Sequence, residues 1–415
     1  MQVPDLVRVK RSFDASHIED LPAAVRAELD RVFPSVPEGA PIAIAVGSRG
    51  VANIATLVRA TVEFLKSRKA SPFIVPAMGS HGGATAEGQR DVLAGYGVTE
   101  ARVGAPIRSS MEVVELPKGQ PGWPVFMDKN AWQAYGVVLL NRVKPHTDYH
   151  GFPESGLMKM AAIGLGKQAQ AMVIHARGVE GLKTMIAPTA RRVLSTGKIL
   201  AGLGVVENAL DQTCRVRAAL AADLETVERG LLEEAAGRMP RLPIRDIDVL
   251  VVDELGKDIS GTGLDTNVIG RIRVLGQKEP DGPAVTTIVV TDLTEGSHGN
   301  AVGVGLADVI TRRLERKIDP IATNENVITS SFLERAKIPL VAETDRQALE
   351  IALRCSWIPE NREPRVIRMR NTLRLEELDV SRSVLDLMRV EEPVEVVGDF
   401  RCPLDAAGML VPFDR

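Results

Sequence analysis

Cysteine and aromatic residues are scarce in this sequence. Its three cysteines, Cys214, Cys355 and Cys402, are scattered over 415 residues and form no CxxC pair. An odd, dispersed set argues against a disulfide framework and against a thiolate metal site, and it is typical of a reducing cytoplasm. Aromatic residues make up only 4% of the chain, which is too few for the stacking platforms that bind nucleic-acid bases.

The sequence also lacks an excess of charge and long apolar runs. The formal net charge is −3, and no run of lysine or arginine indicates a nucleic-acid surface. No stretch reaches the roughly twenty apolar residues that a membrane span needs. Residues 1–14 have no apolar core of signal-peptide length. We therefore expect a cytoplasmic protein with no nucleic-acid or membrane partner.

Buried strands and amphipathic helices alternate along both halves of the chain. In the first half we predict strands over residues 42–48, 72–77 and 136–140, and helices over 53–67, 85–94 and 167–176. In the second half we predict strands over 247–253, 286–292, 338–342 and 365–368, and a helix over 306–317. Such alternation implies parallel βαβ units. The predicted fold class is therefore α/β, with mostly parallel sheets.

The length and one proline-rich segment indicate two domains. A chain of 415 residues suits two domains of ordinary size. Pro240 and Pro243 follow a charged helical stretch near residues 220–237, and two prolines so close together are typical of a boundary. We predict domains over residues 1–242 and 243–415, with an active-site cleft between them, because ligands often bind at domain interfaces.

Polar side chains gather where the predicted strands end. In open α/β sheets, ligands bind outside the carboxyl ends of the strands. Strand ends in the first half carry Arg49, His81, Arg142, Lys144 and His146; those in the second half carry Lys257, Asp258, Glu295 and His298. The glycine-rich loop that ends at Asn267 either wraps a ligand or simply turns a corner, and we predict that Asn267 contacts substrate.

Three of the six histidines lie within thirty residues, at positions 146, 150 and 175. Lys159 lies between them, in a glycine-rich run from Gly156 to Gly166 that includes Gly164. Imidazoles transfer protons near neutral pH and bind metals, and a lysine amine can hold a cofactor covalently. Histidine on an apolar helix, as at His175, is more often an ordinary core residue, and Lys159 lies either at an exposed bend or where its amine has a function.

Gly164-Leu165-Gly166-Lys167-Gln168-Ala169 matches GxGxxA, which alone is weak evidence for a dinucleotide site. It lies in mid-chain, and Thr184 stands where the motif's acidic residue is expected. We therefore expect no dinucleotide at this motif, and a phosphate near this helix start stays an open alternative.

These residues resemble the nickel-dependent lactate racemase family and its 2-hydroxyacid racemase and epimerase relatives, most strongly over residues 42–175. The resemblance implies two α/β domains with an active site between them. It also implies a nickel pincer nucleotide tethered to Lys159, with His175 as the single protein ligand of nickel. Gly156 and Gly164 would line this cofactor.

The same resemblance assigns roles to the remaining candidates. His81 would be one acid/base, and either His146 or His150 the second. Arg49 would bind the substrate carboxylate, and Trp357 would line the pocket. Val46 stands where the family has an aspartate, and the loop over residues 259–267 departs from the lactate enzymes, which indicates a 2-hydroxyacid other than lactate.

The sequence thus predicts a 2-hydroxyacid racemase or epimerase that works by reversible hydride transfer. Its partners would be a small-molecule substrate and the cofactor-synthesis proteins, without which the protein would be made in the apo form. Two alternatives stay open: an NAD(P)-dependent dehydrogenase that uses the GxGxxA element, and a non-catalytic ligand-binding homologue.

Overall fold

The computed structural model describes residues 2–47, 50–118, 121–391 and 393–413. The chain forms two compact units, one of Asp14–Met239 and one of Met1–Phe13 with Pro240–Arg415. Both units are α/β with mostly parallel sheets, which confirms the predicted fold class. Among the described residues, no helix has the length and apolar character needed to cross a membrane.

The unit of Asp14–Met239 is built on a five-stranded sheet in the order β3-β2-β6-β7-β8. Its parallel strands are β2 (Pro41–Val46), β3 (Ser71–Pro76), β6 (Gly136–Arg142) and β7 (Ile199–Glu207), and β8 (Thr213–Leu220) is antiparallel to β7. The central strands are continuous apolar runs because both of their faces are covered.

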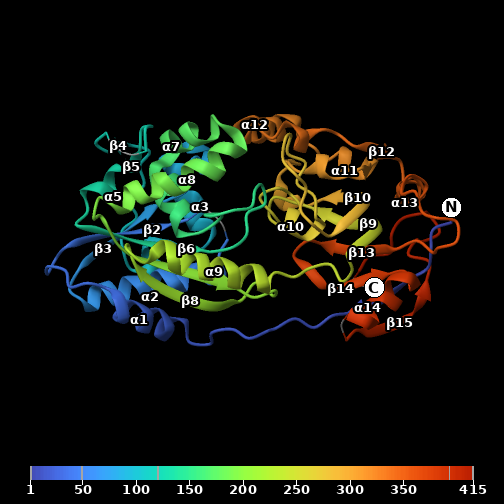
Figure 1. Cartoon of the computed structure of the whole chain (residues 1–415), viewed down its shortest axis with the longest axis horizontal. Coiled ribbons are helices and arrows are strands. Elements are labelled where there is room, and N and C mark those ends of the chain that lie inside the picture. The colour runs from blue at the N-terminus through green and yellow to red at the C-terminus, as the bar shows by residue number, and fades with distance from the viewer. Residues whose placement is uncertain (1, 48–49, 119–120, 392, 414–415) are drawn as a thin grey trace. The chain divides into compact units, whose positions relative to one another are not determined.

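Helices cover both faces of this sheet (Figure 1). On one face, α1 (Leu21–Val32) and α2 (Ile54–Ser67) share a core with the strands; α8 (Gly178–Leu194) lies over the other face, as Figure 1 shows. The remaining elements are η1 (Gly82–Ala84), α3 (Ala86–Gly95), α4 (Glu100–Val103), β4 (Val113–Glu115), β5 (Phe126–Asp128), α5 (Lys129–Gln133), α6 (Leu157–Lys159), the π-helical turn η2 (Met160–Gly164), α7 (Leu165–His175) and α9 (Leu224–Arg238).

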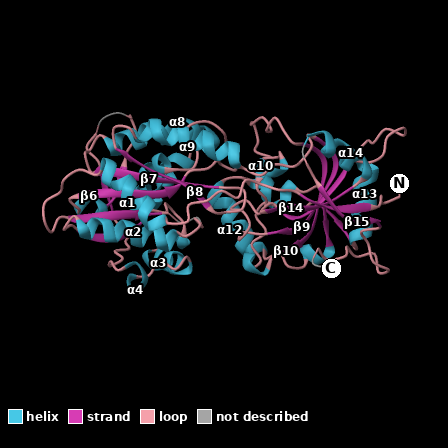
Figure 2. Ribbon diagram, turned by 90° about the horizontal axis from the view of Figure 1, so that it is seen from below, coloured by secondary structure: helices cyan, strands magenta, loops and turns pink. Residues whose placement is uncertain are grey.

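The second unit contains a twisted eight-stranded sheet, visible as a fan of strands in Figure 2, in the order β12-β11-β10-β9-β13-β14-β1-β15. The first five strands are parallel: β12 (Leu340–Ala342), β11 (Val309–Thr311), β10 (Ala284–Leu293), β9 (Asp246–Leu255) and β13 (Val366–Asn371). The last three pair antiparallel: β14 (Arg374–Val380), β1 (Leu6–Lys10) and β15 (Glu395–Arg401).

The helical segments of this unit are α10 (Thr266–Ile269), η3 (Glu295–Ser297), η4 (Val304–Leu306), α11 (Arg312–Glu315), α12 (Pro320–Ser330), η5 (Leu333–Ala336), α13 (Asp345–Cys355) and α14 (Arg382–Glu391). The helix predicted over residues 306–317 is wrong, because Val309–Thr311 form a buried strand between β10 and β12 and only α11 follows. β-Branched Val309, Ile310 and Thr311 suit a pleated strand, and their pairing outweighs the apparent helical spacing.

Strand β1 joins the first thirteen residues to the second unit, whereas the sequence prediction grouped them with residues 14–242. It lies between β14 and β15, where Val7 and Val9 are buried in the core beside Leu378 and Val380. The N-terminal segment is therefore an inner strand of a sheet formed almost wholly by residues more than two hundred positions away.

Truncating one side chain tests this placement. Val9 is fully buried and Lys10 is exposed on the next position of the same strand. Val9→Ala should lower the free energy of unfolding by about 2 kcal/mol through lost burial and a residual cavity. Lys10→Ala should change it by less than about 0.5 kcal/mol. Chemical denaturation measures both, and equal effects would show that β1 is not packed in the core.

Candidate functional site

The candidate site lies at the carboxyl edge of the five-stranded sheet, where such folds bind ligands. The loop after β3 carries His81, and the loop after β6 carries His146 and His150. The helical run α6–η2–α7 packs against both segments. The Gly79 N–H donates to the Gly164 carbonyl at 3.2 Å, and the Asn141 amide donates to the Gly156 carbonyl at 3.0 Å.

Lys159 and His146 meet directly in this region. The Lys159 Nζ lies 2.5 Å from the His146 Nε2. His146 is buried and Lys159 is half-buried, at the last position of α6. The two residues come from different elements, thirteen positions apart in sequence, so their contact is a product of the fold.

The hydrogen bond at His146 Nδ1 indicates which partner donates in the contact between His146 and Lys159. The Asp148 backbone N–H donates to His146 Nδ1 at 3.0 Å, and a nitrogen that accepts carries no proton. The imidazole proton is therefore on Nε2, which donates to the Lys159 Nζ. A lysine nitrogen accepts a hydrogen bond only as a neutral amine, so this geometry predicts that Lys159 is a neutral, nucleophilic amine.

Glu154 fixes the loop that presents His146. Its carboxylate accepts the His146 N–H at 2.6 Å and the Gly151 N–H at 2.9 Å, and it lies 3.4 Å from His150 Nδ1. The buried Tyr149 ring packs on the His146 ring with centroids 4.6 Å apart. Burial raises the Tyr149 pKa well above its usual value, so its hydroxyl stays protonated and donates to the Pro153 carbonyl.

His175 is the half-buried last residue of α7, which follows the helix of Lys159 after η2 and has a kink at Lys167. Burial lowers the His175 pKa, a positive charge on Lys159 lowers it further, and Asp148 opposes both. If Lys159 is neutral, the second effect vanishes and burial still dominates. His175 is thus a neutral imidazole near pH 7, the form that binds metals.

Glu228 of α9 holds the start of the helix that carries Lys159. Its buried carboxylate accepts the backbone N–H of Met158 at 2.8 Å and that of Leu157. A Cβ on Gly156 would lie 2.6 Å from this carboxyl carbon, so a larger residue there would displace the Glu228 carboxylate. Gly156, predicted to line a cofactor, has this packing role.

Gly164 is also a packing position, because a Cβ there would lie 2.7 Å from the Ala77 carbonyl oxygen. It lies inside a helical run and follows helix α6, not a strand. The GxGxxA element therefore lacks the strand–turn–helix context of a dinucleotide fingerprint, and nothing in this geometry favours the dehydrogenase alternative.

The other predicted residues are placed as follows. His150 is 47% exposed and pairs with Glu154. His81 is exposed on its loop. Arg49 lies outside the described residues. Asn267 and Trp357 belong to the other unit.

In that other unit, the predicted strand-end loops meet. The Lys257 N–H donates to the Ser297 hydroxyl at 2.9 Å, and the Thr294 hydroxyl donates to Asp258 at 2.5 Å. Asn267 is half-buried in α10, where its amide donates to Asp265 at 3.0 Å. Trp357 is 88% exposed and follows Ser356, which bonds Asp248 and Thr287 in the amino-terminal halves of β9 and β10. Trp357 thus lies away from the carboxyl edge.

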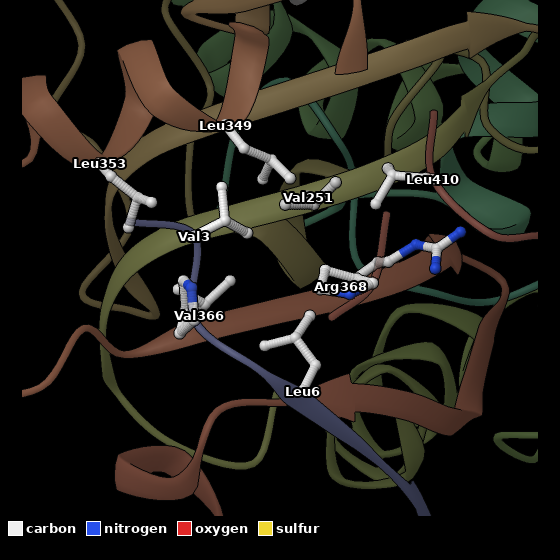
Figure 3. A pocket seen from close by; sticks show the side chains of 10 residues that line it. Val3, Leu6, Val251, Leu349, Leu353, Val366, Arg368 and Leu410 are labelled. Carbon is white, nitrogen blue, oxygen red and sulfur yellow. The ribbon is translucent and has the colours of Figure 1, made fainter. Parts of the chain in front are cut away.

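The second unit also holds two cavities. One, of about 10 Å³, is lined mostly by aliphatic side chains around Leu6 and Val251 (Figure 3). It is at the lower limit for a single water and is a packing void. The other, of about 430 Å³, is lined by Arg8, Arg368 and Asp379 beside the segment Arg401–Pro403.

Three residues of the site were not found by sequence reasoning: Glu154, Glu228 and Lys167. Each is a buried charged side chain in a segment whose sequence pattern is typical of a loop, a solvated helix or a glycine-rich turn. No group of three or more His, Cys, Asp or Glu side chains in the described part of the chain is arranged to hold a metal. A metal ion with only one protein ligand would not need such a group of side chains.

Comparison with solved structures shows a similar fold in the lactate racemase apoprotein from Thermoanaerobacterium thermosaccharolyticum. The TM-score is 0.51 and the sequence identity 11%, over 89% of this chain and 99% of that chain. At this identity the similarity establishes the fold. No protein-family model and no curated protein matches the sequence.

Selective acylation tests the state of Lys159. An ordinary lysine is neutral in roughly one molecule in 2,500 at pH 7. Lys159 should therefore react with an acylating reagent at least about tenfold faster than exposed Lys278, as measured by peptide mass spectrometry. His146→Ala should remove this advantage and His150→Ala should keep it. Equal rates in both variants would refute the hydrogen-bond assignment.

The pH dependence of stability tests Glu228. Burial raises its pKa from 4.5 to about 7. The folded state therefore binds this proton more tightly than the unfolded chain, and the associated stability is complete below pH 4.5 and lost as pH rises through about 7. The loss is at most about 3 kcal/mol.

Glu228→Gln should abolish this loss, so the free energy of unfolding of the variant minus that of the native protein should rise between pH 5 and 8. Glu233→Gln, at an exposed position of the same helix, is the control and should give a flat difference. Parallel curves for both substitutions would contradict the role of Glu228.

Proposed function

We propose that this protein is a racemase or epimerase of a 2-hydroxyacid. The observation that carries the proposal is the contact between the Lys159 amine and the His146 imidazole at the carboxyl edge of the sheet, with His175 on the same helical run. The fold, which is similar to that of a lactate racemase apoprotein, supports it.

The residues present fit a nickel pincer nucleotide. As a neutral amine, Lys159 would form an amide with an activated carboxyl group of the cofactor, from which the activating group and the amine proton would depart. A neutral His175 imidazole is the form that ligates nickel. When bound, the cofactor would supply an acceptor for the hydride of the substrate carbon. The dense packing around Gly156 and Gly164 fixes the backbone from which Lys159 projects.

The side chains of this chain would bind substrate and move its hydroxyl proton. Inverting a carbon that carries a hydroxyl needs a proton acceptor for each of two directions, since the hydroxyl points differently in the two enantiomers. We assign these roles to His81 and His146. His146 is preferred over His150 because it is buried, held by Glu154 and faces Lys159, whereas His150 faces solvent.

Acylation of Lys159 would also change its contact with His146. An amide nitrogen is a donor and not an acceptor, so the hydrogen bond from Nε2–H to Nζ would be lost and this N–H could donate to the substrate oxygen. Arg49, by its guanidinium, would bind the substrate carboxylate in bidentate fashion.

Production of the protein together with cofactor-synthesis proteins tests the proposal. We expect equimolar nickel by elemental analysis and a mass adduct on the peptide that contains Lys159. Lys159→Ala should lose both, and His175→Ala should keep the adduct while releasing nickel. Chiral chromatography of short and sugar-derived 2-hydroxyacids should show racemisation or epimerisation, and His81→Ala should lower the rate by at least about a hundredfold while keeping the adduct.

Protein that carries neither nickel nor an adduct under these conditions would refute the proposed cofactor. Nickel and adduct without inversion of any hydroxyacid would refute the proposed reaction.

A further inference from the structure

Lys167 is a wholly buried lysine in a conformation that costs energy. Its side chain is 0% exposed, and its φ of 54° and ψ of −158° break the helical geometry inside α7, near the start of that helix. Residues with a Cβ rarely adopt such a positive φ, and burial of an ammonium group needs compensating partners. Glycine would fit this backbone more easily, so the side chain of Lys167 has a role that outweighs its conformational cost.

The Lys167 Nζ has two hydrogen-bond acceptors and one ion-pair partner, each from a different element. It donates to the carbonyl of Pro76, the last residue of β3, and to Gln89 Oε1 of α3 at 2.9 Å. It lies 3.2 Å from Asp128 Oδ2, and Asp128 is also 0% exposed. Asp128 supplies the negative charge that a buried ammonium group requires.

Gln89 continues this network to the loop that carries His81. Its side chain is 0% exposed, and its Nε2 donates to the Gly79 carbonyl at 2.9 Å and to the His81 carbonyl at 3.3 Å. A lysine ammonium has donors only, so the end of the Gln89 amide that faces Lys167 must be the oxygen. Lys167 thereby turns both N–H donors of Gln89 toward the two loop carbonyls.

We propose that Lys167 and Gln89 are positioning residues for His81, with the ammonium of Lys167 fixing the direction of the Gln89 amide that holds the Gly79–His81 backbone. The relevance of this positioning to chemistry rests on the proposed function, in which His81 exchanges a proton with substrate. Within the loop, the His81 N–H donates to the Met78 carbonyl and the Ala84 N–H donates to the Ser80 carbonyl. These bonds join residues that are close together in the sequence. The amide of Gln89, together with the Gly79 N–H that donates to the Gly164 carbonyl, links this loop to the buried part of the unit.

Changing only the functional group of Gln89 distinguishes a role in positioning the loop from a general contribution to stability. Gln89→Glu keeps an acceptor for Lys167, and adds an ion pair with it, but replaces the two donors to the loop by an oxygen that repels its carbonyls. Glu87→Gln, at an exposed position of α3, is the matched control.

In the apo-protein, hydrogen exchange of the amides of residues 79–85 should rise at least about tenfold in Gln89→Glu and stay unchanged in Glu87→Gln. The midpoint of thermal unfolding should change by less than about 4 °C. The His81 imidazole signal, identified by its loss in His81→Gln, should move in the proton NMR spectrum of Gln89→Glu, while that of exposed His17 should not.

Unchanged exchange and an unmoved His81 signal in Gln89→Glu would overturn the proposal. Faster exchange spread equally over β2, β3 and the loop would also overturn it, because the network would then serve stability alone. None of these measurements needs cofactor or turnover. A loop that loosens as expected in a protein that inverts no hydroxyacid would keep the positioning role and end the proposed function.

Discussion

The hydrogen bond between His146 and Lys159 is the interaction on which the proposed chemistry depends. An ammonium at this position would be unreactive, and a histidine with its proton on Nδ1 would face the lysine as an acceptor. The Asp148 backbone N–H excludes that tautomer by donating to Nδ1. One backbone amide thus sets the tautomer of the imidazole, and we expect the imidazole in turn to keep the amine neutral.

Three buried charged side chains hold the backbone segments that carry His146, Lys159 and His81. Glu154 fixes the His146 loop, Glu228 fixes the first turn of α6, and Lys167, through Gln89, fixes the His81 loop. Each bonds mainly to backbone groups or to another buried polar side chain. Such bonds set direction more strictly than apolar packing does, and leaving one unmade in a buried site is costly. Their burial is consistent with a site that needs fixed geometry.

Much of the local structure follows from the sequence alone. The helix predicted over residues 53–67 corresponds to α2, and Thr85 caps α3 by accepting the Gly88 N–H. These signals are local, so a single segment reveals them. The strand at Val309–Thr311 was misread because its three β-branched residues lie within a stretch that also has helical spacing, and its pairing with β10 is set by distant residues.

The site was predictable only in part, because contacts between distant segments of the chain also determine which of its side chains are buried. The sequence identified His146 and Lys159 through residue type and the position of strand ends. It gave no sign that Glu228, inside a charged helix, is buried, or that Lys167 meets Asp128, because burial is decided by segments far away in the chain. The membership of β1 in the second unit depends likewise on long-range pairing.

The most direct measurement is X-ray absorption at the nickel edge of protein produced with the cofactor-synthesis proteins. The account predicts sulfur ligands from the cofactor and a single imidazole, with the imidazole contribution lost in His175→Ala. Nickel bound by several imidazoles, or by oxygen and nitrogen ligands without sulfur, would contradict the claim that Lys159 and His175 hold one shared group.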